Sequence, residues 1–445
     1  MGNEQVYSVL GIGFGPANLS LAVALEEFGY PRGVHFVERA VAFQWQDEQL
    51  LPGSDIQNNP FRDLAMPRNP DSAYTFVKHL AARGALTDYL HLNARFPSRR
   101  EYAGYLAWAA EAFRGSVDYG RSVVGLSLVE HDGAEVFRLE TDVGRPRLGR
   151  TVVLGTGRSP RIPAEFQRGM GPTAFHSTKY LSSIGRLGNR RIRVAVVGSS
   201  QSAIEIMLDL LDRPNVTQVV SIQRGIGFRL KDTSPYSRRV FLPEFVDYFH
   251  PLPRAVKARL RADLRSINYG ACDQDVIDRL AGVQREYELI GSDRLVLVPF
   301  SEVAQATLHG QHDARRLVVR DVNHRSESVL DVDVVILATG FRDFGTGRDD
   351  ERYHPLLGGV LDRLVLDVDG VPVVARDYSL QFRPDRYGGP SPKLYLNGLC
   401  EASHGMGDAG ALAMLSMRST DILESLTRHL GAVDGERHLT AEASR

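Results

Sequence analysis

The chain has 445 residues, of which 43% are hydrophobic and 24% charged, a globular composition that excludes disordered, collagen-like and coiled-coil classes. The 53 Lys and Arg residues nearly balance the 54 Asp and Glu residues, and the net charge of -1 gives no reason to expect nucleic acid or an anionic membrane as the main partner. The two cysteines are not spaced as a zinc site or redox pair, and the N-terminal residues lack the pattern of a signal peptide. No apolar stretch reaches the roughly 20 residues of a membrane helix. We expect a cytoplasmic protein without a membrane segment or a metal site.

The start of the chain predicts a strand, a glycine turn and a helix, in that order. The turn is Gly11-x-Gly13-x-Gly15 and is followed by Pro16. Glycines at these positions let the backbone approach a pyrophosphate at the N-terminus of the helix. Glu38 ends the next predicted strand, where a carboxylate can accept hydrogen bonds from a ribose. Together these features favour a dinucleotide site over a purely structural turn.

A second unit of the same kind begins at residue 193. Its turn lacks the later glycines and could by itself be a packed connection, but its duplication of the first unit favours a nucleotide site. Arg224 and Arg229 follow the next predicted strand, where a 2'-phosphate would bind, and this favours NADPH over NADH. The alternative is that both arginines are simply solvated. The cofactor-binding candidates in the turn itself are Gly198, Ser200, Gln201 and Ser202.

Two further predicted strands, at residues 151–154 and 334–338, each end in a Thr-Gly turn. We interpret both as strands that return beneath a bound nucleotide, and Thr339 and Gly340 as cofactor-binding candidates. Two nucleotide sites without a P-loop, nucleophile elbow or zinc pattern indicate a flavoprotein that is reduced by a nicotinamide. The predicted fold is therefore α/β, with two dinucleotide-binding, Rossmann-like domains and a small helical subdomain. A non-catalytic nucleotide-binding module is the alternative from a different class.

Ordered motifs along nearly the whole chain resemble the flavin-dependent N-hydroxylating monooxygenases. The best-known members of that family hydroxylate L-ornithine or L-lysine in siderophore assembly. The main matching motifs are Gly13-Phe-Gly-Pro-Ala-Asn-Leu19, Phe43-x-Trp45, Gln57 with Asp63-Leu64, Arg68-Asn-Pro-x-Ser-x-Tyr-Thr-Phe76, Gln201-Ser-Ala, Asp232-x-Ser-Pro235, Asn268-Tyr269, Ala338-Thr-Gly-Phe341, and Glu401-x-Ser-His-Gly405 with Asp408.

The resemblance implies an FAD-binding domain built from residues 1–187 and 330–445, and an NADPH-binding domain at residues 188–329. Within the latter, residues 242–292 would form a helical substrate-binding insertion. NADPH would reduce FAD, O2 would add to give a flavin hydroperoxide, and the neutral amine of an amino acid would attack its distal oxygen. The resemblance also implies a homo-oligomer, either a dimer or a tetramer.

The family motifs assign roles to individual residues. Gln57 resembles the glutamine beside the flavin and nicotinamide, so Gln57 and Asn268 are the catalytic candidates. Trp45 and Gly407 fall at cofactor-binding positions. From the residues alone, Arg99 and Glu101 predict a structural ion pair with no catalytic role.

The expected substrate region departs from the ornithine enzymes at four positions: Gln46 replaces a histidine, Gly407 replaces a serine, and the other two changes introduce arginines. The lysine that binds the substrate carboxylate there is Arg62 here, and an asparagine becomes Arg238, while Asn268 is retained as a substrate contact. Two arginines in one small pocket require an anion, so we expect an aspartate-like substrate that is hydroxylated at its α-amine. The alternative is that Arg238 faces solvent or pairs with Asp232 or Glu244, which leaves an ornithine or lysine pocket held by Arg62.

Overall fold

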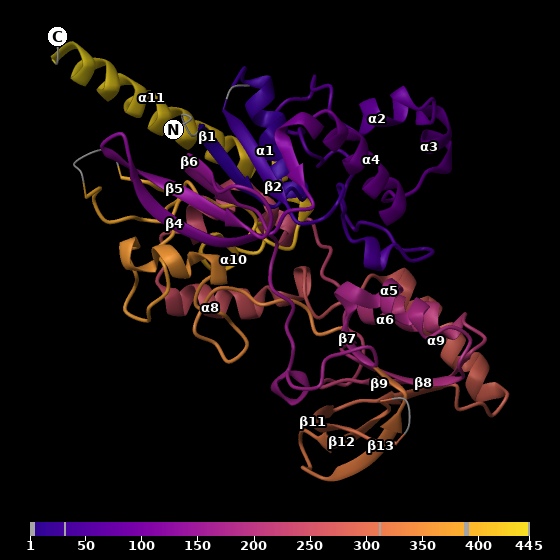
Figure 1. The fold of residues 1–445 in the computed structure, drawn as a ribbon. Coiled ribbons are helices and arrows are strands. Elements are labelled where there is room, and N and C mark those ends of the chain that lie inside the picture. The colour runs from indigo at the N-terminus through magenta and orange to yellow at the C-terminus, as the bar shows by residue number, and fades with distance from the viewer. Residues whose placement is uncertain (1–4, 31–32, 311–312, 387–390, 444–445) are drawn as a thin grey trace.

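The computed structural model describes residues 5–30, 33–310, 313–386 and 391–443, which form two α/β units (Figure 1). The first unit is built on a seven-stranded sheet in the order β3-β2-β1-β6-β5-β4, with β15 also paired to β6. The strands β4, β5 and β6 pair antiparallel, and all the other pairs are parallel. Its strands are β1 (Val6–Ile12), β2 (Val34–Glu38), β3 (Val117–Tyr119), β4 (Val123–His131), β5 (Ala134–Thr141), β6 (Arg147–Leu154) and β15 (Lys393–Leu396). Its helices include α1 (Pro16–Glu27), α2 (Phe76–Ala82), α3 (Leu86–Leu92), α4 (Arg99–Glu111) and α11 (Leu415–Ala443).

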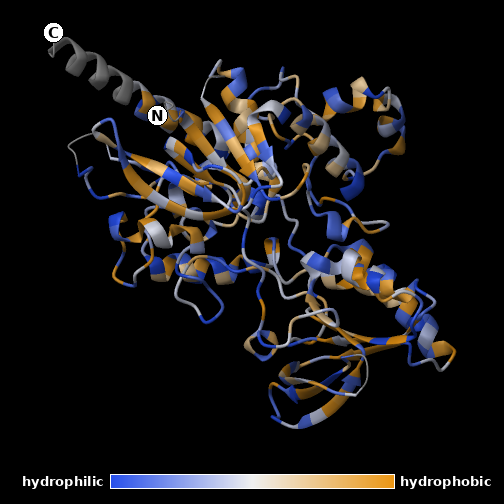
Figure 2. Ribbon diagram, in the orientation of Figure 1, coloured by the Kyte–Doolittle hydropathy of each residue, from blue (hydrophilic) through white to orange (hydrophobic). Residues whose placement is uncertain are grey.

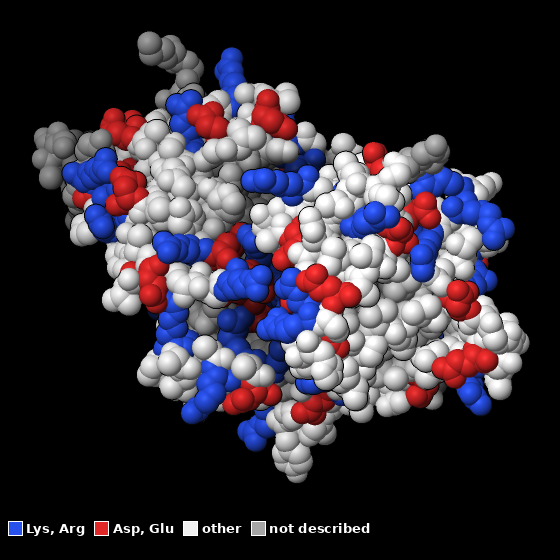
Figure 3. All heavy atoms as spheres, turned by 90° about the horizontal axis from the view of Figure 1, so that it is seen from below, with Lys and Arg blue, Asp and Glu red and all other residues white. Residues whose placement is uncertain are grey.

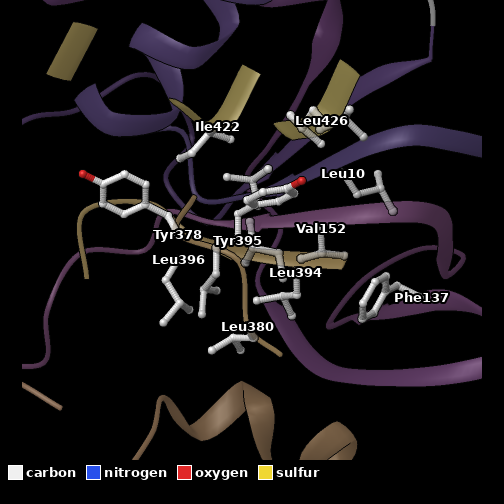
Figure 4. Close-up of a cluster of buried hydrophobic side chains, with 14 of the residues drawn as sticks. Leu10, Phe137, Val152, Tyr378, Leu380, Leu394, Tyr395, Leu396, Ile422 and Leu426 are labelled. Carbon is white, nitrogen blue, oxygen red and sulfur yellow. The ribbon is translucent and has the colours of Figure 1, made fainter. Parts of the chain in front are cut away.

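The core of the first unit joins both ends of the described chain. Leu10, Val152 and Leu394, from three neighbouring strands, are fully buried in it. Ile422 and Leu426 of α11 belong to the same cluster (Figure 4). Strands covered on both faces are continuous apolar segments, as the hydropathy of the ribbon shows (Figure 2). These apolar runs are the reason why the strands could be predicted from the sequence.

The second unit has a five-stranded, wholly parallel sheet in the order β10-β9-β8-β14-β7. These strands are β7 (Ala174–His176), β8 (Ile192–Val197), β9 (Val216–Ile222), β10 (Leu295–Val298) and β14 (Val334–Leu337). A smaller antiparallel sheet consists of β11 (Ser301–Leu308), β12 (Arg315–Asp321) and β13 (Glu327–Val332). The helices are α5 (Tyr180–Arg186), α6 (Gln201–Leu211) and α9 (Gln274–Leu289). The predicted fold class, with two Rossmann-like units, is confirmed.

The expected boundaries at residues 188 and 329 do not follow the sheets. Strand β7 comes before residue 188 and β14 comes after residue 329, yet both pair within the second sheet. A buried strand has the same apolar pattern whichever sheet it joins, so the sequence does not show this pairing. The second unit therefore extends beyond both expected boundaries.

The segment 242–292 is largely helical, as predicted, but it is not one separate part. Helices α7 (Pro243–Phe249) and α8 (Arg254–Asp263) lie against α10 (Glu401–His404) of the first unit. Helix α9 instead buries Val276 and Leu280 in the core of the second unit. The predicted insertion therefore divides between the two units.

Two of the connections between the units lie side by side. Pro160 and Phe341 form an antiparallel bridge, and the N–H groups of Arg161 and Arg342 donate to the carbonyls of Gly340 and Ser159, both at 2.9 Å. The two connections are thus hydrogen-bonded to each other.

None of the described helices is long and apolar enough to cross a membrane. Within the same part of the chain, no group of three or more His, Cys, Asp or Glu side chains is arranged to hold a metal ion.

Candidate functional site

The absence of a side chain has different consequences at the three glycines of the first turn. A Cβ on Gly11 would lie 2.0 Å from the Phe36 ring, and one on Gly13, at φ +84°, would lie 2.8 Å from the Gly155 carbonyl oxygen. A Cβ on Gly15 would meet nothing within 4 Å. Gly11 and Gly13 therefore allow close packing of the strands, whereas Gly15 leaves open space in front of α1.

That open space faces the N-terminus of a helix. Gly15 is the N-cap of α1 and Pro16 its first residue, with no side-chain cap and no acidic residue in the first turn. Free N–H groups and the helix dipole at this end suit an anion. Beside the turn, the Glu38 carboxylate accepts hydrogen bonds from the N–H groups of Phe14, at 2.7 Å, and Ala40, at 2.8 Å. The residues present therefore fit the pyrophosphate end of a dinucleotide.

The second turn also joins a strand to an uncapped helix N-terminus, and one of its positions leaves no room for a side chain. Gly198 has a φ of +141°, and a Cβ there would lie 2.3 Å from the Ala338 carbonyl oxygen at the end of β14. Ser200 is the N-cap of α6, whose N-terminus again has no side-chain cap, and Gln201 and Ser202 form the first turn of the helix. All the predicted residues of this turn thus gather at one helix N-terminus.

The turn after β14 is tied to the first connection between the units. The Thr339 hydroxyl donates to the Arg161 carbonyl at 2.5 Å, and the Gly340 carbonyl accepts the Arg161 N–H at 2.9 Å. The Arg161 side chain forms an ion pair with Asp349 at 3.2 Å, but its Nε is buried without a hydrogen-bond partner. Arg161 is a cation at this edge of the second sheet that the sequence analysis missed.

Several arginines converge near Arg161. Burial lowers the pKa of its guanidinium; the negative charge of Asp349 opposes this shift, and the positive charges of Arg224, Arg265 and Arg348 add to it. Arg224 and Arg229 are exposed after β9. Figure 3 shows Lys and Arg side chains, with Asp and Glu side chains among them, around a hollow in one face of the molecule. Such a concentration of positive charge suits a phosphate-bearing ligand.

Arg62 and Arg238 lie close enough to repel each other. Burial lowers the pKa of the Arg62 guanidinium, and the positive charge of Arg238 lowers it further. One terminal nitrogen of Arg62 is buried without a hydrogen-bond partner. Neither arginine forms an ion pair with a carboxylate in the described part of the chain, so the alternative pairing of Arg238 with Asp232 or Glu244 is not formed.

Asn268 also presents an unused donor. It directly follows a 3-10 helix, η6 (Arg265–Ile267), and its Nδ2 is buried without a partner. Buried donors are almost always satisfied in native proteins, so an orphaned one indicates a missing acceptor. A Cβ on Gly410 would lie 2.8 Å from this nitrogen, so only glycine leaves room here.

Gln57 is held between two residues that the sequence analysis missed. Its Nε2 donates to the Asp273 carboxylate at 2.8 Å, and its Oε1 accepts from Lys231 Nζ at 3.3 Å. Its backbone has a φ of +51°, which is uncommon for a residue other than glycine, asparagine or aspartate. Lys231 stands directly before the Asp232-x-Ser-Pro motif, and Asp273 stands directly before α9. Neither position in the sequence indicates a contact with Gln57.

The predicted ion pair between Arg99 and Glu101 is wrong. Arg99, in the first turn of α4, instead pairs with Glu205 of α6 at 2.9 Å, and both side chains are almost completely buried. The Arg99 guanidinium also donates to the carbonyls of Gln49 and Asp55. Nearness in the sequence suggested Glu101, whereas the actual partner comes from the other unit.

Two predicted cofactor positions lie within packed structure. Trp45 lies edge-on to Tyr102, with 5.7 Å between the ring centroids. Gly407 leaves room for Met414, whose Cγ would be 3.0 Å from an added Cβ. Both residues are therefore in contact with packed parts of the protein.

The segment around Gly407 is anchored by a buried ion pair. Arg418 of α11 is 1% exposed and pairs with Asp408 at 2.8 Å, and it also donates to Asn397 at 2.7 Å. The Asp408 carboxylate accepts the Cys400 N–H as well. Arg418 therefore anchors this loop to the C-terminal helix α11.

A second buried network surrounds Glu401. Its carboxylate accepts a hydrogen bond from Tyr269 and lies 3.5 Å from Arg158. Arg158 in turn donates to Asp343 at 2.9 Å, and Arg261 donates to the same carboxylate at 2.6 Å. Burial raises the pKa of Glu401 to about 7, although Arg158 opposes the shift.

Glu401 predicts a pH dependence of stability. Its pKa rises from 4.5 to about 7 on folding, so the folded protein holds more protons than the unfolded chain in this window. The free energy of unfolding should therefore fall as pH rises through the window. Glu401→Gln should remove this contribution, whereas the exposed Glu424→Gln should not, as measured by denaturation at pH 5, 6, 7 and 8. Equal pH profiles for parent and Glu401→Gln would contradict the assignment.

Known proteins resemble this chain over most of its length. The family model described as L-lysine 6-monooxygenase/L-ornithine 5-monooxygenase matches residues 5–343. An L-ornithine N(5)-monooxygenase of Burkholderia cepacia is 34% identical over 91% of this chain and 91% of that protein. Among solved structures, an ornithine N-hydroxylase of Kutzneria sp. 744, described with reduced FAD, NADP+ and L-ornithine, is 32% identical, with a TM-score of 0.86 over 95% of this chain and 99% of that one.

A solved L-lysine 6-monooxygenase from Pseudomonas syringae is 33% identical, covers 95% of this chain and 99% of that one, and has a TM-score of 0.83. A thioredoxin reductase from T. acidophilum, at 14% identity and a TM-score of 0.53, shares the fold alone. The motif resemblance is thereby confirmed over the length of the protein. The chain belongs to the L-lysine 6-monooxygenase/L-ornithine 5-monooxygenase family of flavin-dependent, N-hydroxylating enzymes.

Proposed function

We propose that this chain uses FAD, NADPH and O2 to convert the primary amine of a small amino acid into a hydroxylamine. FAD, when bound, supplies the oxygen-activating redox chemistry. The first glycine turn, with the open space beside Gly15, would hold its pyrophosphate, and the turn at Gly198 would hold that of NADPH. The Kutzneria relative, described with FAD, NADP+ and L-ornithine, supports this assignment.

The amino acid would be bound through its carboxylate. The observation that carries this proposal is the buried, unpartnered nitrogen of Arg62 beside a second arginine, Arg238. A guanidinium matches a carboxylate with two parallel hydrogen bonds and satisfies the orphaned donor. Asn268, with its own orphaned Nδ2, would contact the head group of the substrate.

Two substrate classes are consistent with such a pocket. The relatives favour a diamino acid, since they are named for L-ornithine and L-lysine. Arg62 keeps the positive charge of the lysine that the family resemblance implies at this position. The positive charge of Arg238 is the observation that favours the second candidate, an aspartate-like amino acid with a second carboxylate. Ornithine or lysine is the reading with more support, and aspartate is the specific competitor.

The substrate class is tested by measuring the hydroxylamine formed by the FAD-loaded protein with NADPH and O2. Aspartate, glutamate, 2,3-diaminopropionate, ornithine and lysine are compared in parallel. Product from ornithine or lysine supports the first candidate, and product from aspartate alone supports the second. If NADPH does not reduce the bound flavin and no product forms, the protein would instead be a non-catalytic nucleotide-binding module.

The variant Arg238→Ala distinguishes the aspartate-like substrate from the diamino acid substrate. If the substrate has two carboxylates, kcat/KM should fall by about 100-fold, because truncating one partner of a buried charge pair costs about 2–5 kcal/mol. FAD content should stay unchanged. The matched control is Arg239→Ala, at the exposed neighbouring arginine. Unchanged kinetics of Arg238→Ala would exclude the acidic substrate.

A further inference from the structure

Asp273 occupies the N-cap position of α9 but does not cap that helix. Aspartate is favoured at N-caps because its carboxylate accepts N–H groups of the first turn. Here no side-chain cap bond is formed. The buried carboxylate accepts instead from Gln57 Nε2, in the other unit, at 2.8 Å. A residue needed only to start α9 would bond to its own helix.

Asp273 also contacts the second glycine turn. Its backbone N–H donates to Gln201 Oε1 at 3.0 Å, and Gln201 Nε2 donates to Glu205 at 3.1 Å. With a donor on one side and a carboxylate on the other, the orientation of the Gln201 amide is unambiguous. Gln201 is the first residue of α6, so Asp273 touches the N-terminus at which a nicotinamide nucleotide would bind.

The orientation of the Gln57 amide is determined in the same way. A carboxylate accepts only and an ammonium donates only, so Nε2 must face Asp273 and Oε1 must face Lys231. The left-handed backbone of Gln57 costs about 1–3 kcal/mol and persists only where surrounding contacts hold it. Asp273 and Lys231 provide such contacts.

These contacts close into a ring that crosses between the units twice. From Gln201 the ring continues through Glu205 to Arg99, at 2.9 Å, and returns to the loop of Gln57 through the Asp55 carbonyl, at 3.3 Å. The Asp55 carboxylate then accepts the Gln57 N–H at 2.9 Å. Gln201 and Gln57 are therefore connected by polar contacts along both sides of the ring.

We propose that Asp273 is a positioning residue that couples the nucleotide turn at Gln201 to the Gln57 amide, so that nucleotide binding and the orientation of Gln57 depend on each other. This inference rests on the proposed function, because it takes the nucleotide to be NADPH or NADP+. Coupling of this kind is reciprocal between the two sites. Gln57 then contributes to nucleotide binding only while Asp273 orients it.

The test is a double-mutant cycle on NADP+ affinity, measured by calorimetry with the FAD-loaded protein. Its variants are Gln57→Ala, Asp273→Ser and the double variant. Serine keeps a favoured N-cap and the N–H to Gln201, but it is too short to reach Gln57. We expect Gln57→Ala to raise the Kd by about tenfold in the parent and by less than about twofold beside Asp273→Ser. If the fold changes in Kd of the two single variants multiply to give that of the double variant, the proposal is overturned.

Three further measurements separate coupling from a merely structural role. Asp273→Asn keeps a hydrogen-bond acceptor for Gln57, so its Kd for NADP+ should stay within about threefold of the parent value. The exposed Asp278→Ala, on the same helix, should leave the Kd unchanged. A lower melting temperature for Asp273→Ser with an undiminished effect of Gln57→Ala would contradict coupling. Coupling without any hydroxylamine product would overturn the proposed function alone, and product without coupling would overturn this inference alone.

Discussion

Arg62→Ala should lower kcat/KM for hydroxylamine formation by about 100-fold or more, whichever amino acid proves to be the substrate. The buried nitrogen of Arg62 has no partner within the described protein, so the substrate carboxylate would be its acceptor. Losing one side of a buried, charge-assisted pair costs about 2–5 kcal/mol, and about 1.4 kcal/mol corresponds to a factor of ten. The measurement is product formation at a series of substrate concentrations, with FAD content determined in parallel.

Two variants make this result specific. Arg62→Lys keeps the charge but loses the two-pronged geometry, so its kcat/KM should lie between those of the parent and Arg62→Ala. Arg100→Ala removes an exposed arginine at the start of α4 and should leave kcat/KM unaltered. Parent-like turnover by Arg62→Ala would show that the carboxylate is bound elsewhere.

Arg418→Leu should lower the free energy of unfolding by about 3–5 kcal/mol. Arg418 is 1% exposed, and its loss would leave the Asp408 carboxylate buried without its cation. Breaking a buried pair from one side is costly, because the remaining charge stays desolvated. Since Asp408 holds the loop that follows β15, FAD should also dissociate more readily. Denaturant titrations followed by flavin fluorescence would measure both effects.

The exposed Arg428→Leu, on the same helix, is the matched control and should change stability by less than about 0.5 kcal/mol. Adding Asp408→Asn to Arg418→Leu should recover part of the loss, because the unpaired charge is then removed. A destabilisation by Arg418→Leu no larger than that of the control would refute this account.

The local features of the fold were predictable because they depend on short segments. Each strand that ends in a glycine turn is an apolar run followed by a conformation that a Cβ would prevent, as at Gly13 and Gly198. The division into units was not predictable in detail. Strands β7 and β14 are short and buried, and nothing within them says which sheet they join.

One spatial relation of the candidate site was predictable from residue types. Arg62 and Arg238 were expected to lie near each other, and the pKa of Arg62 responds to that proximity. The partners of Gln57 and Arg99 could not be found in this way. Asp273 resembles an ordinary helix start, and Glu205 lies within a helix of another unit, so only the packing of the two units reveals their contacts.

The paired connections at Pro160 and Phe341 bear on how the second unit is joined to the first. The chain first enters the second unit and finally leaves it through two segments that are hydrogen-bonded to each other, so the outer ends of the unit meet at one place. Between them, the segment that carries α7 and α8 returns to the first unit, so the second unit is attached at more than this one place. A rotation of the second unit about the paired segments would therefore also have to displace the connections on either side of α7 and α8.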